Sequence, residues 1–584
     1  MTPSVLARQL QDNLLDYVRA TLDLDDPELD QALIDHLGSA DGLFRGPYLR
    51  LGLPFATGSG DNPLTIKPDF PPYEHQLQAF RQLHSDGTPQ NTLVTTGTGS
   101  GKTECFLYPL LDHCWRNQHR PGVQAILIYP MNALASDQAR RIAETIHGDE
   151  RLRGLRAGLY VGGSGESKTM SADRLIEDKA TLRANPPQIL LTNYKMLDFM
   201  LLRPDERKLW QHNAPDTLRY VVIDELHTFD GAQGSDVACL LRRLKTRLGM
   251  KAGTLVCAGT SATIGSSTDP ETFVRLAEFA STVFGETFSA DAVVRETRLS
   301  RAEFLEAPGP TPLPALDLDN EELLLPGTDP RQWRRNQMTL WLGTPELDPL
   351  ALGRVLRRHP LLHHLLALAA DRPRPLPEVD EELPRRLPEW ALYTRRQRRG
   401  MLDSFLALVS YARRPVGDRQ APLVTLQLQL WTRELTRLLR ALPRQRDGEV
   451  LPPRFAWWTE LPQARSPDGL HGVQAACREC GAAGLAVVET EADRLQGRLT
   501  WDPSSVGRGW LEGSRDCRFL WPRPTLEAGQ TTTEMRHWLD PDSGTLHGTA
   551  PVDEHGAVCA LPVLVEQTLI GKKRARFARR CPNC

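Results

Sequence analysis

The chain has 584 residues, enough for three or four domains with sizeable cores. Its 70 Lys and Arg nearly balance its 73 Asp and Glu, so the net charge of -3 excludes a uniformly basic nucleic-acid coat but not a local basic patch. Ten cysteines are too few for a disulfide scaffold, and neither a signal peptide nor a membrane-spanning apolar run is visible, so we expect a cytoplasmic protein without a membrane partner.

The first 69 residues predict a helical arm. Apolar residues recur at helical spacing from Val5 to Val18, and the Gly- and Pro-rich stretch GLFRGPYLRLGLPF follows. We therefore expect residues 1–69 to form an N-terminal helical arm with an extended lead-in.

Residues 70–270 alternate short apolar runs with helical segments. Near-continuous apolar strands separated by helices are typical of a parallel sheet that is covered on both faces. The pattern predicts an α/β domain with a doubly wound parallel sheet, whose strands are the runs NTLVTT, AILIYP, AGLYVG, QILLTN, YVVIDE and GTLVCAG.

The segment VTTGTGSGKTE, from Val94 to Glu104, predicts a phosphate cradle between a strand and a helix. Its glycines let backbone N–H groups converge on phosphate oxygens at the positive end of the helix. Lys102 would reach the β- and γ-phosphates of ATP, and the Thr103 hydroxyl would bind Mg²⁺. The rest of the cradle is formed by Thr96, Gly97, Thr98, Gly99, Ser100 and Gly101.

The segment YVVIDELHTFDG places two carboxylates at the end of an apolar strand, where doubly wound sheets bind their ligands. Asp224 would hold Mg²⁺, and Glu225 would orient and deprotonate the attacking water. His227 is assigned a catalytic role only if the family pattern described below holds.

The second half of the chain changes character. Leu- and Arg-rich stretches such as LWTRELTRLLRAL, broken by Pro-rich linkers, predict a helical insertion over residues 271–455. The Trp-, Gly- and Cys-containing residues 456–584 predict a small β-rich module. Its two Cys-x-x-Cys pairs predict a structural Zn²⁺ site made by Cys477, Cys480, Cys581 and Cys584. Two unrelated thiol pairs, or substitute ligands at Cys517 and Cys559, are the alternatives.

The motifs TGTGSGKTE, DELH and GTSAT together resemble motifs I, II and III of a superfamily 2 helicase of the DExH kind. The resemblance implies a RecA-like P-loop NTPase domain, in which Thr96 at the first motif position is normal. It also implies that YEHQ reads adenine through Gln76, with Tyr73 stacking or packing beside it. Ser261, Ala262 and Thr263 would couple the nucleotide state to the grip on a strand.

Two further segments, YPMNALASDQ and LLTNYKMLDFMLLRP, resemble motifs Ia and Ib, which bind the sugar-phosphate backbone of one nucleic-acid strand. Ordinary strand-to-helix capping explains each residue singly about as well, but not the ordered series. The residues implicated are Pro130, Asn132, Ala133, Gln138, Thr192 and Asn193.

LFRGPYLRLGLPF and DELHTFDGAQGSDVACLLRRL are similar to segments of the bacterial MrfA-like repair helicases and of the large helicases of phage-defence islands. The resemblance is strong over residues 70–265 and weak across the helical region. It implies an ATP-dependent helicase or translocase that acts on DNA, as a single strand or as a duplex with a tail, in preference to RNA.

A helicase motor also needs a second RecA-like domain with a Q-x-x-G-R-x-x-R-like motif, and the sequence after Ile264 contains no such motif. We therefore expect this chain to be the N-terminal half of the motor, with the second domain supplied in trans or lost by truncation, and to turn ATP over slowly by itself. The alternative is a non-hydrolysing nucleic-acid-binding scaffold subunit that uses ATP as a structural ligand.

Overall fold

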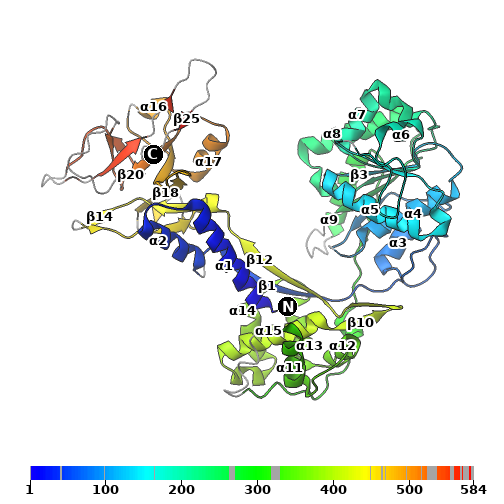
Figure 1. Cartoon of the computed structure of the whole chain (residues 1–584), viewed down its shortest axis with the longest axis horizontal. Coiled ribbons are helices and arrows are strands. Elements are labelled where there is room, and N and C mark those ends of the chain that lie inside the picture. The colour runs from blue at the N-terminus through cyan, green and yellow to red at the C-terminus, as the bar shows by residue number, and fades with distance from the viewer. Residues whose placement is uncertain are drawn as a thin grey trace.

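The computed structural model describes residues 2–39, 42–97, 99–163, 165–261, 270–316, 329–446, 449–461, 465–466, 469–494, 496–514, 516–522, 536–552, 558, 560–565, 568–569 and 578–579. Figure 1 shows an α/β unit on the right, a helical unit at the bottom and a β-rich unit on the left, with a long β-ribbon running between them. None of the described helices is both long and apolar enough to cross a bilayer.

The α/β unit contains a sheet of seven parallel strands in the order β4-β5-β3-β6-β7-β2-β8. All six apolar runs named above form strands, so the prediction of a doubly wound parallel sheet is confirmed. The sheet does not end at residue 270, however, because a seventh strand from beyond that point pairs with β2. The strands are β2 (Thr92–Thr95), β3 (Ala125–Tyr129), β4 (Ala157–Tyr160), β5 (Ile189–Asn193), β6 (Tyr220–Ile223), β7 (Val256–Ser261) and β8 (Val293–Arg295).

Helices cover both faces of this sheet (Figure 1). On β3, Ile126 and Ile128 enter one apolar core, whereas Ala125 and Leu127 enter the other, which explains the uninterrupted apolar run. The helices are α3 (Glu74–Leu83), α4 (Lys102–Arg116), α5 (Asn132–Gly148), α6 (Lys179–Ala184), α7 (Tyr194–Leu202), α8 (Gly231–Arg247) and α9 (Pro270–Phe284).

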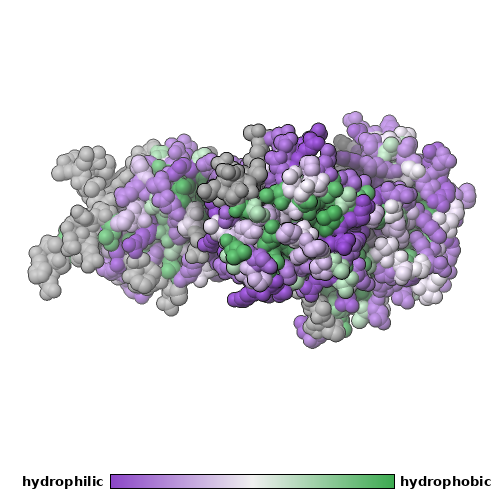
Figure 2. Space-filling model, turned by 90° about the horizontal axis from the view of Figure 1, so that it is seen from below, coloured by the Kyte–Doolittle hydropathy of each residue, from purple (hydrophilic) through white to green (hydrophobic). Residues whose placement is uncertain are grey.

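The helical unit packs around Trp341, Phe405 and several leucines. Seen from below, apolar residues gather over the middle of the molecule, where this unit lies, while the α/β unit at the right end is mostly hydrophilic (Figure 2). Its helices are α10 (Arg301–Phe304), α11 (Pro330–Leu342), α12 (Pro349–Leu356), α13 (Pro360–Ala369), α14 (Leu376–Glu382) and α15 (Arg395–Tyr411).

The N-terminal arm is shared between the other units. Helices α1 (Pro3–Leu22) and α2 (Pro27–Gly38) pack on Leu438 and Trp457 of the β-rich unit. Strand β1 (Phe44–Gly52) then pairs antiparallel with β12 (Thr425–Thr432) and with β9 (Arg374–Pro375), and it buries Leu49 and Leu51 in the core of the helical unit.

The β-rich unit contains an antiparallel sheet in the order β16-β13-β18-β19-β20-β23-β21-β22, with β17 paired to β18. Its strands are β13 (Leu438–Ala441), β16 (Phe455–Trp457), β17 (Arg465–Ser466), β18 (Gly469–Ala476), β19 (Ala483–Val488), β20 (Cys517–Pro522), β21 (Arg536–Leu539), β22 (Leu546–His547) and β23 (Leu561–Val565). The other elements are β10 (Arg413–Val416), β11 (Arg419–Pro422), β14 (Gln445–Arg446), β15 (Glu449–Val450), α16 (Glu491–Arg494), α17 (Pro503–Leu511), β24 (Thr568–Leu569) and β25 (Ala578–Arg579).

The prediction of a helical insertion over residues 271–455 is wrong beyond α15. The stretch LWTRELTRLLRAL comprises the end of β12, a 3-10 turn at Leu435–Arg437 and β13. Leu438 and Leu439 enter two different cores on the two faces of β13, and such a doubly buried strand has the same run of apolar residues as a buried helix segment.

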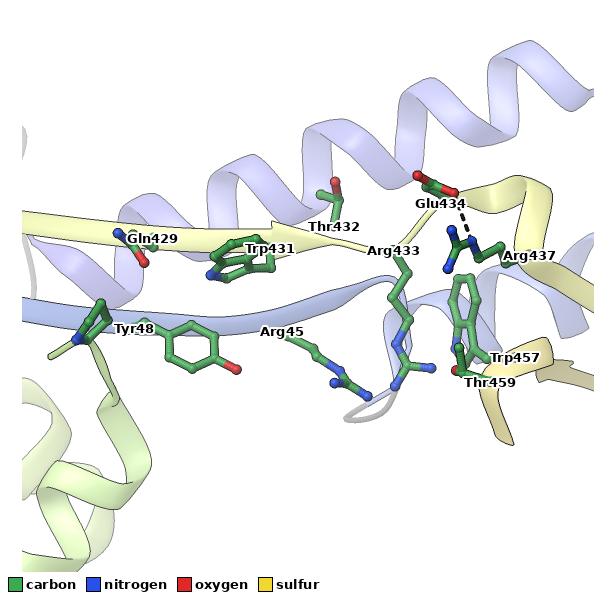
Figure 3. A pocket seen from close by; sticks show the side chains of 11 residues that line it. Arg45, Tyr48, Gln429, Trp431, Thr432, Arg433, Glu434, Arg437, Trp457 and Thr459 are labelled. Atoms are coloured by element: carbon green, nitrogen blue, oxygen red, sulfur yellow. Dashed lines mark ion pairs between the residues drawn. The ribbon is translucent and has the colours of Figure 1, made fainter. Parts of the chain in front are cut away.

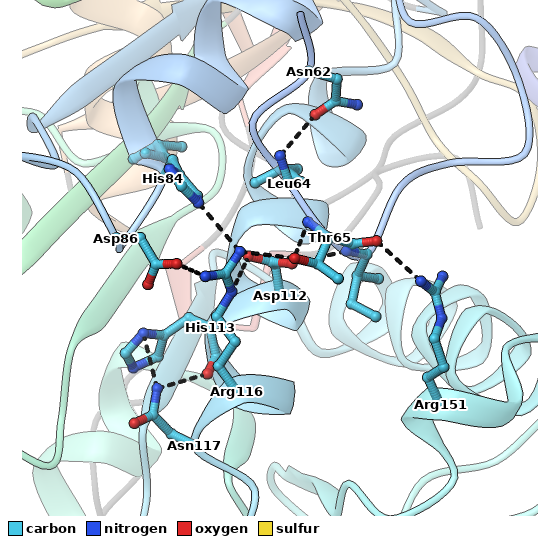
Figure 4. Close-up of polar contacts among 12 residues, drawn as sticks. Asn62, Leu64, Thr65, His84, Asp86, Asp112, His113, Arg116, Asn117 and Arg151 are labelled. Carbon is cyan, nitrogen blue, oxygen red and sulfur yellow. Dashed lines mark hydrogen bonds and ion pairs between the residues drawn. The ribbon is translucent and has the colours of Figure 1, made fainter.

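The lead-in between β1 and α3 is fastened to the helix of the phosphate loop (Figure 4). The buried carboxylate of Asp112 on α4 accepts hydrogen bonds from the backbone N–H groups of Thr65 and Ile66, both at 2.8 Å. The same carboxylate pairs with Arg116 Nε at 2.8 Å. The arm is thereby joined to the element that carries the candidate site.

Candidate active site

The phosphate loop leaves β2 after Thr95 and turns into α4 at Lys102. The Thr96 and Ser100 hydroxyl groups lie 2.6 Å apart and brace the loop. Gly101 adopts a left-handed conformation with φ 76°, and a Cβ atom there would lie 2.3 Å from Gln76 Nε2, so this position requires glycine. Gly97 is half-buried and Gly99 is exposed, while Thr98 lies outside the described residues.

The carboxylates of DELH follow β6, next to this loop. Asp224 is 7 % exposed, and its side chain accepts a hydrogen bond from the Thr260 hydroxyl on the neighbouring β7. The Thr260 Oγ1 also accepts the N–H of Glu225 at 3.0 Å, and Glu225 has a left-handed backbone with φ 52°. Lys102 Nζ lies 3.2 Å from Glu225 Oε1, so the structure brings the two motifs into direct contact.

The electrostatics of Asp224 reflect its position. Burial raises the pKa of Asp224 above its usual value, and the charge of Glu225 acts in the same direction. The hydrogen bond from Thr260 and the charge of Lys102 act against this shift of the pKa. Burial destabilises the charged form of the Asp224 carboxylate, and a cation bound beside it would stabilise that form.

His227 lies between Glu225 and the third motif. Its Nδ1 lies 3.4 Å from Glu225 Oε2 and 3.3 Å from Ser261 Oγ at the end of β7. His227 therefore links motif II to motif III. Ala262 and Thr263, which were assigned to the same coupling, lie outside the described residues.

The expected adenine-reading residues, Gln76 and Tyr73, lie beside the loop and contact other residues of the protein. Gln76 Oε1 accepts the N–H of Tyr73 at 2.9 Å, and Gln76 Nε2 donates to Gly101 O at 3.2 Å. The Tyr73 ring stacks on His75, whose Nε2–H donates to Ser100 O at 2.9 Å. A contact between Gln76 and a base would exchange one of these hydrogen bonds.

Sequence reasoning missed three residues of the site. Besides Thr260, the Glu296 carboxylate after β8 accepts the N–H of Gly97 at 2.8 Å and pairs with Arg298 Nε at 2.8 Å. Thr260 lies directly before Ser261 and could have been noticed. No local signal marks Glu296 and Arg298, because only the pairing of β8 with β2 brings them to the loop.

The expected strand-contacting residues divide into two groups. The side chains of Asn132 and Asn193 meet at the ends of the neighbouring strands β3 and β5, with Asn193 Nδ2 donating to Asn132 Oδ1 at 2.6 Å. Asn132 and Ala133 are exposed and Pro130 is half-buried.

The side chains of the other two residues are buried. The Thr192 side chain is buried and donates to Tyr160 O at 2.7 Å. Gln138 is 7 % exposed and accepts from Arg141 at 3.4 Å. The Thr192 contact joins β5 to β4, whereas the Gln138 contact lies within α5.

The cysteine pairs are placed only in part. Cys477 and Cys480 occupy the tight turn between β18 and β19, where the Cys477 O accepts the N–H of Gly481 at 3.0 Å. Cys581, Cys584 and the alternative ligand Cys559 lie outside the described residues, and Cys517 is buried on β20. No cluster of three or more His, Cys, Asp or Glu residues suited to a metal ion occurs within the part of the chain that the structure describes.

Residues 73–270 match the family model of DEAD/DEAH box helicases. The Druantia protein DruE of Escherichia coli (strain UMEA 4076-1) is 27% identical over 330 residues, which cover 40% of this chain and 18% of that protein. The uncharacterized ATP-dependent helicase YprA of Bacillus subtilis (strain 168) is 34% identical over 194 residues, which cover 33% of this chain and 23% of YprA.

Among solved structures, the DUF1998 helicase MrfA bound to DNA and AMPPNP matches with 25% identity and a TM-score of 0.32, covering 45% of this chain and 33% of that one. The chain thus spans at most about a third of the length of these three proteins. By the family match and the sequence identities, residues 73–270 are a DEAD/DEAH box helicase domain of superfamily 2, akin to the MrfA-like and phage-defence-island helicases.

Proposed function

We propose that this chain is the first motor part of an ATP-dependent DNA helicase or translocase that works in DNA repair or phage defence. The observation that carries the proposal is the contact of Lys102 with Glu225 at 3.2 Å, beside the buried Asp224. A merely structural loop would have no reason to hold an ammonium group and two carboxylates together at the carboxyl ends of parallel strands.

The residues present fit ATP and Mg²⁺. Thr103 at the start of α4 and the buried carboxylate of Asp224 would hold Mg²⁺, which would neutralise charge on the phosphates. Lys102 would leave Glu225 for the phosphates, because their charge is greater than that of one carboxylate. Glu225, released from that ion pair, would then orient the attacking water and accept its proton.

Nucleic acid would cross the carboxyl ends of β3 and β5. Asn132 and Asn193 are the side chains there that would bind the backbone of one strand, a contact that positions a strand without reading its sequence. His227 and Ser261 would transmit the state of the nucleotide to this surface. The resemblance to the MrfA-like group favours DNA over RNA.

Full activity would need a second RecA-like domain, from a longer protein or from another chain. The arginine that such a domain supplies typically contributes about 10³- to 10⁵-fold in rate. We also propose that the N-terminal arm, the RecA-like domain, the helical unit and the β-rich unit are separate functional parts. The turn at Cys477 and Cys480 would be half of a structural Zn²⁺ site completed by Cys581 and Cys584.

The second candidate function is a scaffold subunit that binds nucleic acid and uses ATP without hydrolysing it. The complete set of Lys102, Thr103, Asp224 and Glu225 favours the motor instead. The two functions separate in an assay of ATP turnover with single-stranded DNA, using the motor completed by its second RecA-like domain. Glu225→Gln should abolish the stimulated turnover while ATP still binds, and unchanged turnover would refute the mechanism.

A further inference from the structure

A cavity of about 620 Å³ opens beside the β1–β12 ribbon, between the helical and β-rich units. Tyr48 and Arg45 line it from β1, Trp431 from β12, and Arg433 and Trp457 close its far end (Figure 3). None of these residues belongs to the ATP site. We call this cavity the ribbon groove.

The groove occupies the outward face of the ribbon. On β12, Leu426 and Leu428 pack against the core of the helical unit, and Leu430 packs against the core of α1 and α2. Because side chains alternate along a strand, Gln429 and Trp431 point to the opposite face. That face is left open to solvent, and Trp431 is 61 % exposed.

A β-bulge brings both lining residues of β1 to this face. Tyr48 pairs with Gln429 and Arg45 pairs with Trp431, although Tyr48 and Arg45 are three residues apart and would face opposite sides of a regular strand. The register shift between these two residues restores the common face. Bulges re-aim side chains in this way, often beside functional sites.

The charges of the groove are unevenly compensated. Arg433 pairs with Glu460 at 2.6 Å and lies over the ring of Trp457, and Arg437 pairs with Glu434 at 2.9 Å. These pairs fix the end of the groove. Arg45 is exposed and forms no ion pair with any residue that the structure describes, so its charge faces the groove beside Trp431.

We propose that the ribbon groove binds an unpaired nucleic-acid strand, with bases stacked on Trp431 and Tyr48 and a phosphate held by Arg45. The exposed Trp431 ring and the half-buried Tyr48 ring lie next to an arginine without a described acidic partner. Aromatic rings beside a free arginine are a combination that binds single strands, because every base has a π-face and every nucleotide a phosphate. The inference rests on the proposed function, since it supplies that motor with a strand contact remote from ATP.

The test is the affinity of the full chain for labelled single-stranded DNA, single-stranded RNA and blunt duplex DNA, measured by fluorescence anisotropy without nucleotide. Trp431→Ala should weaken binding of the single strands by about 5- to 150-fold, the range that corresponds to the loss of one stacked base. Trp431→Phe should retain most of the affinity. The matched control is Trp510→Ala, because Trp510 is also exposed, at 56 %, but lies on α17.

A loss of affinity for DNA or RNA single strands, larger than the loss for duplex, supports the groove. Equal affinities of the wild type and Trp431→Ala for both single strands would overturn it and leave the groove to a protein partner. An equal loss for blunt duplex would also overturn it, since paired bases cannot stack on a side chain. These results leave the proposed function intact, because that function is tested separately, by the stimulation of ATP turnover by single strands in the completed motor.

Discussion

Replacing Asp112 by alanine should release the lead-in from the phosphate-loop helix. The Asp112 side chain is 1 % exposed and accepts the N–H groups of Thr65 and Ile66. The Ile66 N–H is buried and the Thr65 N–H is partly buried. A buried N–H that loses its acceptor costs about 1–3 kcal/mol, so the local free energy of opening should fall by about 3 kcal/mol. Arg116 adds little to this sum because it keeps its ion pair with Asp86 and its hydrogen bond to the Thr65 hydroxyl at 2.9 Å.

Hydrogen exchange of residues 62–66 measures this opening directly. A loss of about 3 kcal/mol should speed exchange there by about 100-fold in Asp112→Ala. Asp112→Asn keeps an oxygen acceptor and should show a much smaller effect. The matched control is Asp216→Ala, which removes the carboxylate of an exposed ion pair with Arg120 and should change exchange little anywhere. Equal protection of residues 62–66 in Asp112→Ala and the wild type would refute the reasoning.

Three further predictions concern other parts of the chain. Glu296→Gln should weaken ATP binding by up to about 10-fold, because a charged acceptor for the Gly97 N–H becomes a neutral one; equal affinities in a titration would contradict this. Burial lowers the pKa of His113 to about 4, so the folded state keeps this ring neutral at pH values where the unfolded state protonates it. The free energy of unfolding should therefore be unaffected by this group above about pH 6.5 and should fall by up to about 3 kcal/mol as the pH falls toward 4. Urea unfolding between these pH values should therefore depend less on pH in His113→Gln, and an unchanged dependence would argue against it. Cys477→Ser should lower the zinc content per chain, and a wild type without zinc would rule out the proposed metal site.

Local pattern was sufficient to predict six of the seven strands of the sheet and two groups that lie together at their ends. The apolar runs gave six strands, and the motifs around Lys102 and Glu225 gave two groups that do meet, at 3.2 Å. Strand β8 was missed because it has only three residues and follows 31 residues after β7, with α9 between them. Glu296 was missed with it, since its contact with the phosphate loop depends on strand pairing and on nothing local.

The helix prediction at the end of the ribbon was wrong for a different reason. VTLQLQL alternates strictly, and Leu426, Leu428 and Leu430 are the inward residues of β12, yet the leucines that follow suggested a helix. Period 2 and period 3.6 compete in such Leu-rich stretches. Tertiary pairing decides between them, with β1 for β12 and with β16 and β18 for β13. Thr192 illustrates a third limit, because a motif position alone does not tell whether a side chain lies in the sheet or on its surface.

The central claim is that this chain couples ATP to a nucleic-acid strand. It is tested most directly by the rate of ATP turnover of the completed motor, measured with and without single-stranded DNA. We predict that the strand raises the rate and that Lys102→Ala abolishes the turnover with and without it, because Lys102 is the group proposed to bind the phosphates. A rate that is the same with and without the strand would contradict the account.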